Sequence, residues 1–139
     1  MVAAVGLGAV FVNPGPAAAA DDTFWVTTGG ACPSEVNSSW HGFAQFQDYG
    51  PGAPGGGNND DYIIVGDTCA DGVGVKAWAW LDGVLLGSKY NGSGSGHNVV
   101  WDPFGNVTSG HAVGLKVCAT AGNNGTPYNC SSLTRTIDG

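Results

Sequence analysis

Three histidines are the residues of this chain best suited to moving protons: His41, His97 and His111. A hydrolytic triad needs one of them beside a nucleophile and an orienting carboxylate. No G-x-S-x-G turn or comparable motif accompanies any of the three. We therefore interpret them as histidines at strand ends that make ordinary hydrogen bonds.

Paired carboxylates are the second candidate chemistry, because two acids flanking a sugar bond can cleave it. Glu35 is the only glutamate, and four aspartates fall in a predicted tail and an open loop, where burial is not expected: Asp21, Asp22, Asp60 and Asp61. Five further aspartates lie near predicted strand ends and are expected to form turns by bonding backbone amides: Asp48, Asp67, Asp71, Asp82 and Asp102. We predict that the protein is not an enzyme and has no catalytic residue.

Calcium is the third candidate chemistry. One loop offers oxygen ligands from Asn58, Asn59, Asp60 and Asp61, and a second pair comes from Asp67 and Asp71. The calcium-loop pattern with its closing glutamate is absent, and the cysteines lack the C-x-x-C or C-x-x-H spacing typical of zinc. We predict no metal site and no cofactor.

Tryptophan is the residue type that departs most from background, with five copies. Residues 73–81 read as a strand that puts Lys76, Trp78 and Trp80 on one face and small aliphatic side chains on the other. If the aliphatic face is the core, the two indoles and Lys76 form an exposed aromatic strip. If the indoles are the core, Lys76 must escape between the sheets. In a third alternative, the loop 49–61 or the N-terminal segment covers the indoles.

Two more tryptophans are candidate binding residues. Trp25 lies in the apolar run FWV of the first predicted strand, and Trp101 ends a later strand beside Asp102 and Pro103. Buried tryptophan usually has its indole N–H satisfied, and a domain of this size buries one or two. The predicted binding residues are therefore Lys76, Trp25, Trp78, Trp80 and Trp101.

Glycine and proline, with 25 and 7 copies, punctuate the chain and leave no sustained helical period. We predict an all-β fold with strands over 24–28, 41–49, 61–67, 73–81, 84–90, 98–102, 111–119 and 129–137. Asp82-Gly83 lies between two apolar runs and suits a tight hairpin turn. Seven or eight such strands pack most economically as an immunoglobulin-like sandwich of two sheets, with a small β-barrel as the alternative.

Four cysteines in an exported chain predict two disulfides. Three connectivities are possible, and we favour Cys32 with Cys69 and Cys118 with Cys130, because each pair joins sequence neighbours across a loop rich in Gly, Pro and Asn. Each bridge would contribute about 3 kcal/mol to stability by restricting the unfolded chain.

The first twenty residues predict export. They carry no charge, contain an apolar run and end in alanines 18–20, the small-x-small pattern of a signal-peptide cleavage site. The run is too short for a membrane span. We expect residues 1–20 to be a secretory signal, truncated at its start, and residues 21–139 to be a single domain, with 21–40 as an alternative extended N-terminal segment.

Charge excludes two classes of partner. The chain carries seven net negative charges and only four Lys or Arg residues. Nucleic acid and anionic membranes are recognised mainly by clusters of Lys and Arg, so neither is expected to bind after signal cleavage. We predict a secreted, extracellular protein.

Several motifs together resemble a known group of proteins: FQDYG (46–50), GDTCADG (66–72), a Val-rich strand followed by DG (82–83), GLKVC (114–118) and a last cysteine at 130. The chain resembles small secreted actinobacterial proteins over residues 43–139. The resemblance implies a two-disulfide β-sandwich outside the cell and brings no activity or catalytic residues. A fainter similarity is to the adaptor subunits of umbrella-shaped toxin particles.

Binding is therefore the predicted function. An extracellular protein is the preferred partner, since the acidic surface and the first strand FWV favour edge pairing with another chain. A polysaccharide stacking on exposed tryptophan is the first alternative. A protease inhibitor, presenting a loop such as 122–129 near a disulfide, is the second.

Overall fold

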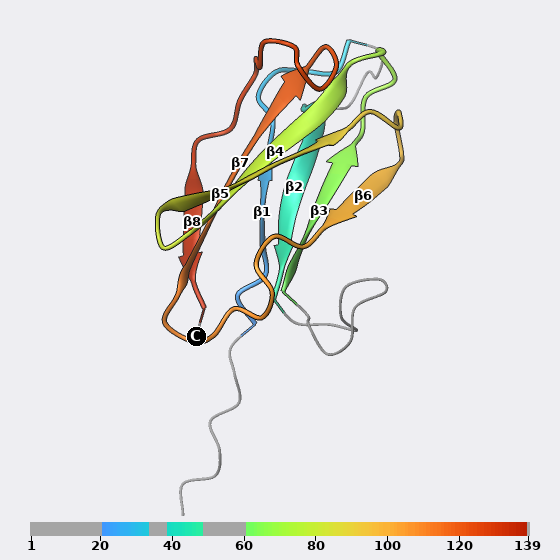
Figure 1. The fold of residues 1–139 in the computed structure, drawn as a ribbon. Helices are drawn as coiled ribbons and strands as arrows, with labels where there is room; N and C mark the ends of the chain where they lie inside the picture. Colours follow the sequence, from blue (N-terminus) through green and yellow to red (C-terminus); the bar gives the residue numbers. More distant parts are fainter. Residues whose placement is uncertain (1–20, 34–38, 49–60, 139) are drawn as a thin grey trace, which may run out of the picture.

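The structure, a computed structural model, describes residues 21–33, 39–48 and 61–138 (Figure 1). These residues form β-strands and no helix, which confirms the all-β prediction. No helix in these ranges has the length and apolar character that a membrane crossing requires. The strands are β1 (Phe24–Thr27), β2 (Gly42–Gln47), β3 (Tyr62–Asp67), β4 (Gly74–Leu81), β5 (Val84–Asn91), β6 (Asn98–Trp101), β7 (Ala112–Thr120) and β8 (Thr134–Ile137).

The strands form two antiparallel four-stranded sheets packed face to face, as the two layers of Figure 1 show. We call the sheet with strand order β1-β2-β3-β6 sheet A, and the sheet with order β5-β4-β7-β8 sheet B. The predicted two-sheet sandwich is confirmed, and the barrel alternative is wrong. Immunoglobulin domains share this architecture but move to the second sheet after their second strand, whereas here the first three strands stay in sheet A.

The core lies between the sheets and is built by the period-two alternation of the strands. Its fully buried members come from the central strands of both sheets: Ala44, Phe46, Ile63 and Val65 from sheet A, and Val75, Ala77, Ala79, Val113, Leu115 and Val117 from sheet B. Because every second residue of β4 and β7 is committed to this core, the residues between them must point to the outer face of sheet B.

Both predicted disulfides are present. Cys32–Cys69 links the segment after β1 to the segment after β3, with 5.5 Å between the Cα atoms. Cys118–Cys130 links β7 to the segment before β8, with 4.1 Å between the Cα atoms. Each sheet therefore carries one covalent link, and the described cysteines include no free thiol. Two disulfides are typical of proteins that fold in an oxidising compartment.

The predicted hairpin at Asp82-Gly83 is also confirmed. It joins β4 to β5, and both residues have positive φ, 51° at Asp82 and 83° at Gly83. This conformation suits a two-residue turn whose twist matches the strands that it connects. The last strand differs from its prediction, because 129–137 shortens to β8 at Thr134–Ile137. Asn129 takes a φ of 47°, which interrupts an extended backbone before β8 begins.

Asp61 was expected to lie in a solvent-exposed loop, and this expectation is wrong. Its side chain is buried, and its Oδ2 atom accepts a hydrogen bond of 2.6 Å from the backbone N–H of Val107. The partner lies 46 residues further along the chain, so no local pattern could predict it. The predicted signal at 1–20, Glu35, the loop 49–60 and its proposed calcium ligands Asn58, Asn59 and Asp60 all lie outside the described residues.

Candidate functional site

The outer face of sheet B carries the predicted aromatic strip. Val75, Ala77 and Ala79 are fully buried, so the aliphatic face of β4 is the core face, as the first of the three alternatives predicted. Lys76, Trp78 and Trp80 alternate with them on the outer side and are half-buried. The two indoles therefore lie on the surface of the sheet with part of their area in contact with solvent.

Strand β7 supplies the neighbours of these indoles. Lys116 is the register partner of Trp78, and Gly114 is the register partner of Trp80. The resulting groove has a volume of about 310 Å³ and is lined by Trp78, Trp80, Leu85, Lys116, Cys118, Pro127 and Cys130. The alternation of β7 puts Lys116 on the side away from the core, and the pairing of β4 with β7 places it beside Trp78.

Two further cations flank the groove. The Lys76 ammonium lies 5.7 Å from the centroid of the Trp78 ring and donates a hydrogen bond of 2.8 Å to the carbonyl oxygen of Asn123. The stem of Arg135 lies over Gly114, since a Cβ atom at Gly114 would be 3.4 Å from both Arg135 Cγ and Trp80 Cβ. The Lys76 ammonium thus lies near the Trp78 ring, and the aliphatic stem of Arg135 lies in the same cross-strand row as Trp80 on the outer face of sheet B.

The outer face of sheet A carries a second aromatic surface. Trp25 on β1 is 68% exposed, and its ring meets Phe43 on β2 edge-on with 6.1 Å between the centroids. A groove of about 430 Å³ lies here and is lined by Trp25, Thr27, Trp40, Phe43 and Thr68. Sequence reasoning proposed Trp25 and missed Trp40 and Phe43. The alternation of GFAQFQ in β2 is the signal that could have placed Phe43 outward.

Backbone geometry makes β1 an open edge at Trp25 and Thr27. Strand β1 is the first strand of sheet A and pairs on one side only, with β2. The N–H of Thr28 donates to the carbonyl of Gly42, so the hydrogen-bonded positions of β1 are the even-numbered ones. The N–H and C=O groups of Trp25 and Thr27 consequently point away from β2, and no hydrogen bond outside the sheet ladder uses their N–H groups within the described ranges.

Trp101, which was also predicted as a binding residue, lines neither groove. It is the register partner of the fully buried Ile63, so its side chain points toward the inner side of sheet A. There it is half-buried and packs against the hydrophobic core. Strand β6, NVVW, has one valine on each face, and alternation therefore gave little indication of which side Trp101 takes.

The two sheets differ in the charged residues that their strands carry. All four cations of the chain lie in strands of sheet B, whose strands contain no Asp or Glu. The strands of sheet A contain no cation and a single carboxylate, Asp67, which is buried. In the described part of the chain, neither Lys nor Arg makes a salt bridge. The outer face of sheet A is therefore uncharged, and that of sheet B is cationic.

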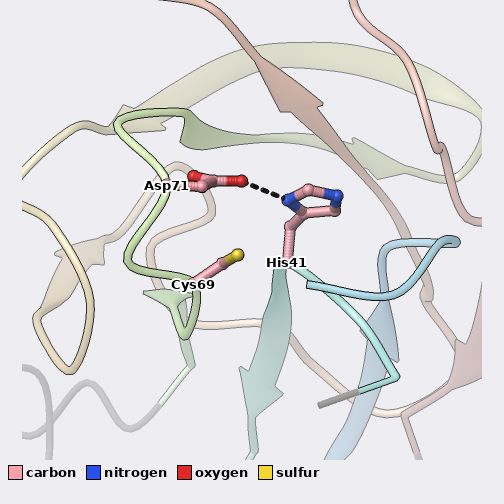
Figure 2. Close-up of side chains that lie close together, drawn as sticks. All are labelled: His41, Cys69 and Asp71. Carbon is pink, nitrogen blue, oxygen red and sulfur yellow. Dashed lines mark hydrogen bonds and ion pairs between the residues drawn. The ribbon is translucent and has the colours of Figure 1, made fainter. Parts of the chain in front are cut away.

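A buried histidine–aspartate pair lies near the disulfides, at the end of the sandwich where β2 begins (Figure 2). His41 Nδ1 and Asp71 Oδ2 are 2.9 Å apart, and the other ring nitrogen, Nε2, lies 3.4 Å from the Asn129 side-chain amide. Cys69 Sγ lies within 4.8 Å of the ligand atoms of this pair, but it is oxidised in the disulfide with Cys32 and is not available as a thiolate ligand. The His41 side chain thus contacts Asp71 and Asn129, and the hydroxyl groups of Thr28 and Thr68 bond the backbone of His41.

An exposed histidine–aspartate pair lies at the opposite end of β4. His111 Nδ1 is 2.6 Å from Asp82 Oδ2, and the Ala112 N–H donates to Asp82 Oδ1 at 2.9 Å. The Ala112 N–H, and after it the His111 side chain, hold the pKa of Asp82 below its usual range. Asp82 is therefore a turn residue that also ties the β4–β5 hairpin to the start of β7. The predicted turn role is confirmed in the same way for Asp67, Asp71 and Asp102, which accept bonds from nearby backbone amides.

Three carboxylates converge where β2 and β8 end: Asp22, Asp48 and Asp138, with oxygen atoms within 4.8 Å of one another. The backbone N–H of Asp22 donates to Asp48 Oδ2 at 2.7 Å. Burial, followed by the neighbouring Asp48 and Asp22, raises the pKa of Asp138. These are the described carboxylates whose geometry could hold a cation, although acidic groups often cluster without one.

The two aromatic grooves are the surfaces best suited to binding, and each combines large rings with a shape that can receive a ligand. Comparison of the chain with protein-family models, with curated proteins and with solved structures found no match.

Proposed function

We propose that the protein is a secreted, non-catalytic binding module that takes up an extended segment of another extracellular protein on sheet A. The segment would lie along the open edge of β1 as an additional strand. One of its apolar side chains would enter the groove lined by Trp25, Trp40 and Phe43. The observation that carries this proposal is the exposed Trp25 on an edge strand whose backbone is open at that residue.

Main-chain recognition is supported by the geometry of β1. The N–H and C=O groups of Trp25 and Thr27 face away from β2, so an added strand could pair with both residues. The side chains of the same two residues line the groove. Backbone pairing would supply affinity, and the groove would select side chains at alternate positions of the partner, as in other cases of strand addition.

The partner segment should be uncharged. The strands of sheet A offer no cation, and their single carboxylate, Asp67, is buried. A charged side chain entering this groove would lose water without gaining an ion pair from these strands. Aromatic or branched apolar side chains would instead bury area against Trp25 and Phe43, which makes the tryptophan a candidate anchor of the interface.

An extracellular location is supported by the two disulfides, which form and persist in oxidising compartments. The signal-like residues 1–20 support the same location from the sequence. The protease-inhibitor alternative is less favoured. Its loop 122–129 turns back on itself through a hydrogen bond from the Gly125 N–H to the Gly122 carbonyl, and its Tyr128 pairs with Ala119 of β7.

Peptides selected from a random extended library on the immobilised protein test this proposal. Binding should slow hydrogen exchange at the backbone amides of Trp25 and Thr27 and leave Val26, already paired with β2, unchanged. Replacing Thr27 with proline removes the outward N–H at a position that an edge strand tolerates, so we expect peptide binding to be lost. Trp25→Ala should weaken it about 30-fold, the loss of about 2 kcal/mol typical of an interface anchor.

Thr27→Ala is the matched control, because it shortens the same side chain and keeps the backbone N–H. It should retain peptide affinity within a factor of a few. Peptides that bind without slowing exchange at Trp25 and Thr27, or that bind Thr27→Pro as well as the unmodified protein, would rule out strand addition at β1.

A further inference from the structure

The outer face of sheet B has a chemistry that the proposed strand addition on sheet A does not use. Its groove is lined by Trp78, Trp80 and Lys116. Lys76 lies near the Trp78 ring, and the stem of Arg135 lies beside Gly114, the register partner of Trp80. Lys76, Lys116 and Arg135 are three of the four cations of a chain with seven net negative charges. The strands that form this face contain no carboxylate. The charge of this face is therefore complementary to an anionic ligand.

The groove lies over the centre of its sheet. Its floor comes mainly from β4 and β7, the two inner strands of sheet B. Strand β4 pairs with β5 and β7, and the other edge of β7 bonds β8 and then Ser131 and Tyr128. No backbone N–H or C=O of these strands is open to an added strand. A ligand here must be recognised through side chains, which means through ring faces and ammonium or guanidinium groups.

The walls of the groove are held in place. The Cys118–Cys130 disulfide and Pro127 line one side, and both restrict local movement of the chain. Trp78 and Trp80 are half-buried and point outward from the same face of one strand, two residues apart. Rigid rings of this kind offer stacking area at a low cost in side-chain entropy.

From these observations we infer that the outer face of sheet B is a second binding site, which takes a polysaccharide with carboxylate groups on its sugar rings. The apolar faces of the sugars stack on Trp78 and Trp80. The sugar carboxylates pair with Lys116 inside the groove and with Lys76 and Arg135 at its margins. The protein then holds an acidic polysaccharide on one sheet and a protein segment on the other.

An acidic protein segment is the competing ligand. It would offer carboxylates to the same cations, but its backbone would find no open strand edge over β4 and β7. A sugar chain needs no such edge, because its recognition uses hydroxyl groups, ring faces and charge. Shape and charge together therefore favour the polysaccharide.

Polygalacturonate, a carboxylate-bearing polysaccharide, is the probe for this site, and its fully methyl-esterified form is the same polymer without the charge. With the disulfide-intact protein at low salt, binding measured by calorimetry or gel retardation should be strong for polygalacturonate and at least tenfold weaker for the ester. Raising sodium chloride should weaken only the binding of the charged polymer.

Variants locate the site. Lys116→Gln keeps most of the side-chain stem and removes the charge, so it should weaken polygalacturonate binding about tenfold. Trp80→Ala should weaken both polymers. Lys89→Gln is the matched control, because Lys89 is the register partner of the buried Ala77 and lies on the inner side of sheet B. Thermal unfolding of each variant should match that of the unmodified protein.

Several results would overturn the inference. Equal binding of the charged and esterified polymers would remove the role of the cations, and equal losses in Lys116→Gln and Lys89→Gln would move the site elsewhere. Polyglutamate binding as tightly as polygalacturonate would identify an acidic protein as the ligand. No binding of polygalacturonate by the folded protein would also refute it. Trp25→Ala should leave polygalacturonate binding intact, so failure of the sheet A proposal would be seen separately.

Discussion

The two outer faces of the sandwich use the same residue type for different purposes. On sheet A, Trp25 protrudes from an edge strand, and its neighbours carry no charge. On sheet B, Trp78 and Trp80 lie over inner strands among cations. The position in the sheet decides what each indole can do, since an edge leaves backbone groups for a partner and a central strand leaves only side chains.

The same contrast explains why the grooves are proposed for different ligands. The sheet A groove opens beside unpaired backbone at Trp25 and Thr27, and a polypeptide can use both. The sheet B groove opens over a fully paired backbone and beside Lys116. A sandwich with one open edge and one cationic face can therefore bind two chemically distinct partners without any change in fold.

Removing each disulfide separately should give the largest difference between the two sheets in the free energy of unfolding. Cys32–Cys69 spans a sequence separation of 37, and Cys118–Cys130 a separation of 12. Loop-closure entropy predicts that replacing both cysteines with alanine lowers the free energy of unfolding by about 4 kcal/mol for the first pair and about 3 kcal/mol for the second. Urea denaturation of the two double variants measures this order. A larger loss for Cys118 and Cys130 would mean that native packing, not restriction of the unfolded chain, sets the contribution of each bridge.

A glycine-to-alanine change on each outer face sharpens the comparison. At Gly66 in sheet A, a Cβ atom would lie 2.2 Å from the Phe43 ring, so the ring must move and the free energy of unfolding should fall by about 1–3 kcal/mol. At Gly114 in sheet B, the nearest atoms would be 3.4 Å away, and the change should be neutral or raise stability by a few tenths of a kcal/mol.

Urea denaturation of both variants measures that difference, and peptide binding provides a second measurement. Gly66→Ala should also weaken binding at sheet A, because Phe43 lines that groove, whereas Gly114→Ala should leave it unchanged. Equal stability of Gly66→Ala and the unmodified protein would show that Phe43 does not rest on this glycine as described.

The sequence predicted those features that depend on local alternation. The Asp82-Gly83 turn and the two cysteine pairs follow from residue spacing within short stretches, and both are confirmed. The aliphatic face of β4, one of the alternatives for the core, is the buried one. Alternation in β4 is clear because small aliphatic residues and large or charged residues occupy opposite faces.

Features that depend on pairing between distant strands could not be predicted. Trp40, Trp25 and Phe43 meet only because β1 pairs with β2, and Lys116 reaches Trp78 only because β4 pairs with β7. The inner side that Trp101 takes follows from its pairing with Ile63, because each face of β6 carries one valine. Asp61 was expected in solvent because its partner, the Val107 N–H, lies far along the chain.

Replacing Asp138, in the acidic cluster that it forms with Asp22 and Asp48, should change the stability of the protein least. The pKa of Asp138 is raised above its unfolded value by burial and by the neighbouring Asp48 and Asp22. The folded protein therefore holds the proton more tightly, so the contribution of this group to stability is fully present below the unfolded pKa of 3.8 and is lost as the pH rises through the folded value.

Asp138→Asn should consequently raise the melting temperature at pH 7 and flatten its decline above pH 4. Differential scanning calorimetry from pH 3 to pH 7 compares the two proteins. Asp102→Asn is the control, since Asp102 is an exposed acid outside the cluster. A variant that is less stable at pH 7 than the unmodified protein would mean that the charged form of Asp138 is favoured in the fold.

The placement of every lysine and arginine in the strands of sheet B has a consequence for how the molecule meets a surface. A molecule with its positive groups in one layer and its carboxylates elsewhere experiences a torque near a negatively charged support, and it turns that layer toward the support. Adsorbed in this orientation, it would display Trp25 and the edge of β1 to the medium.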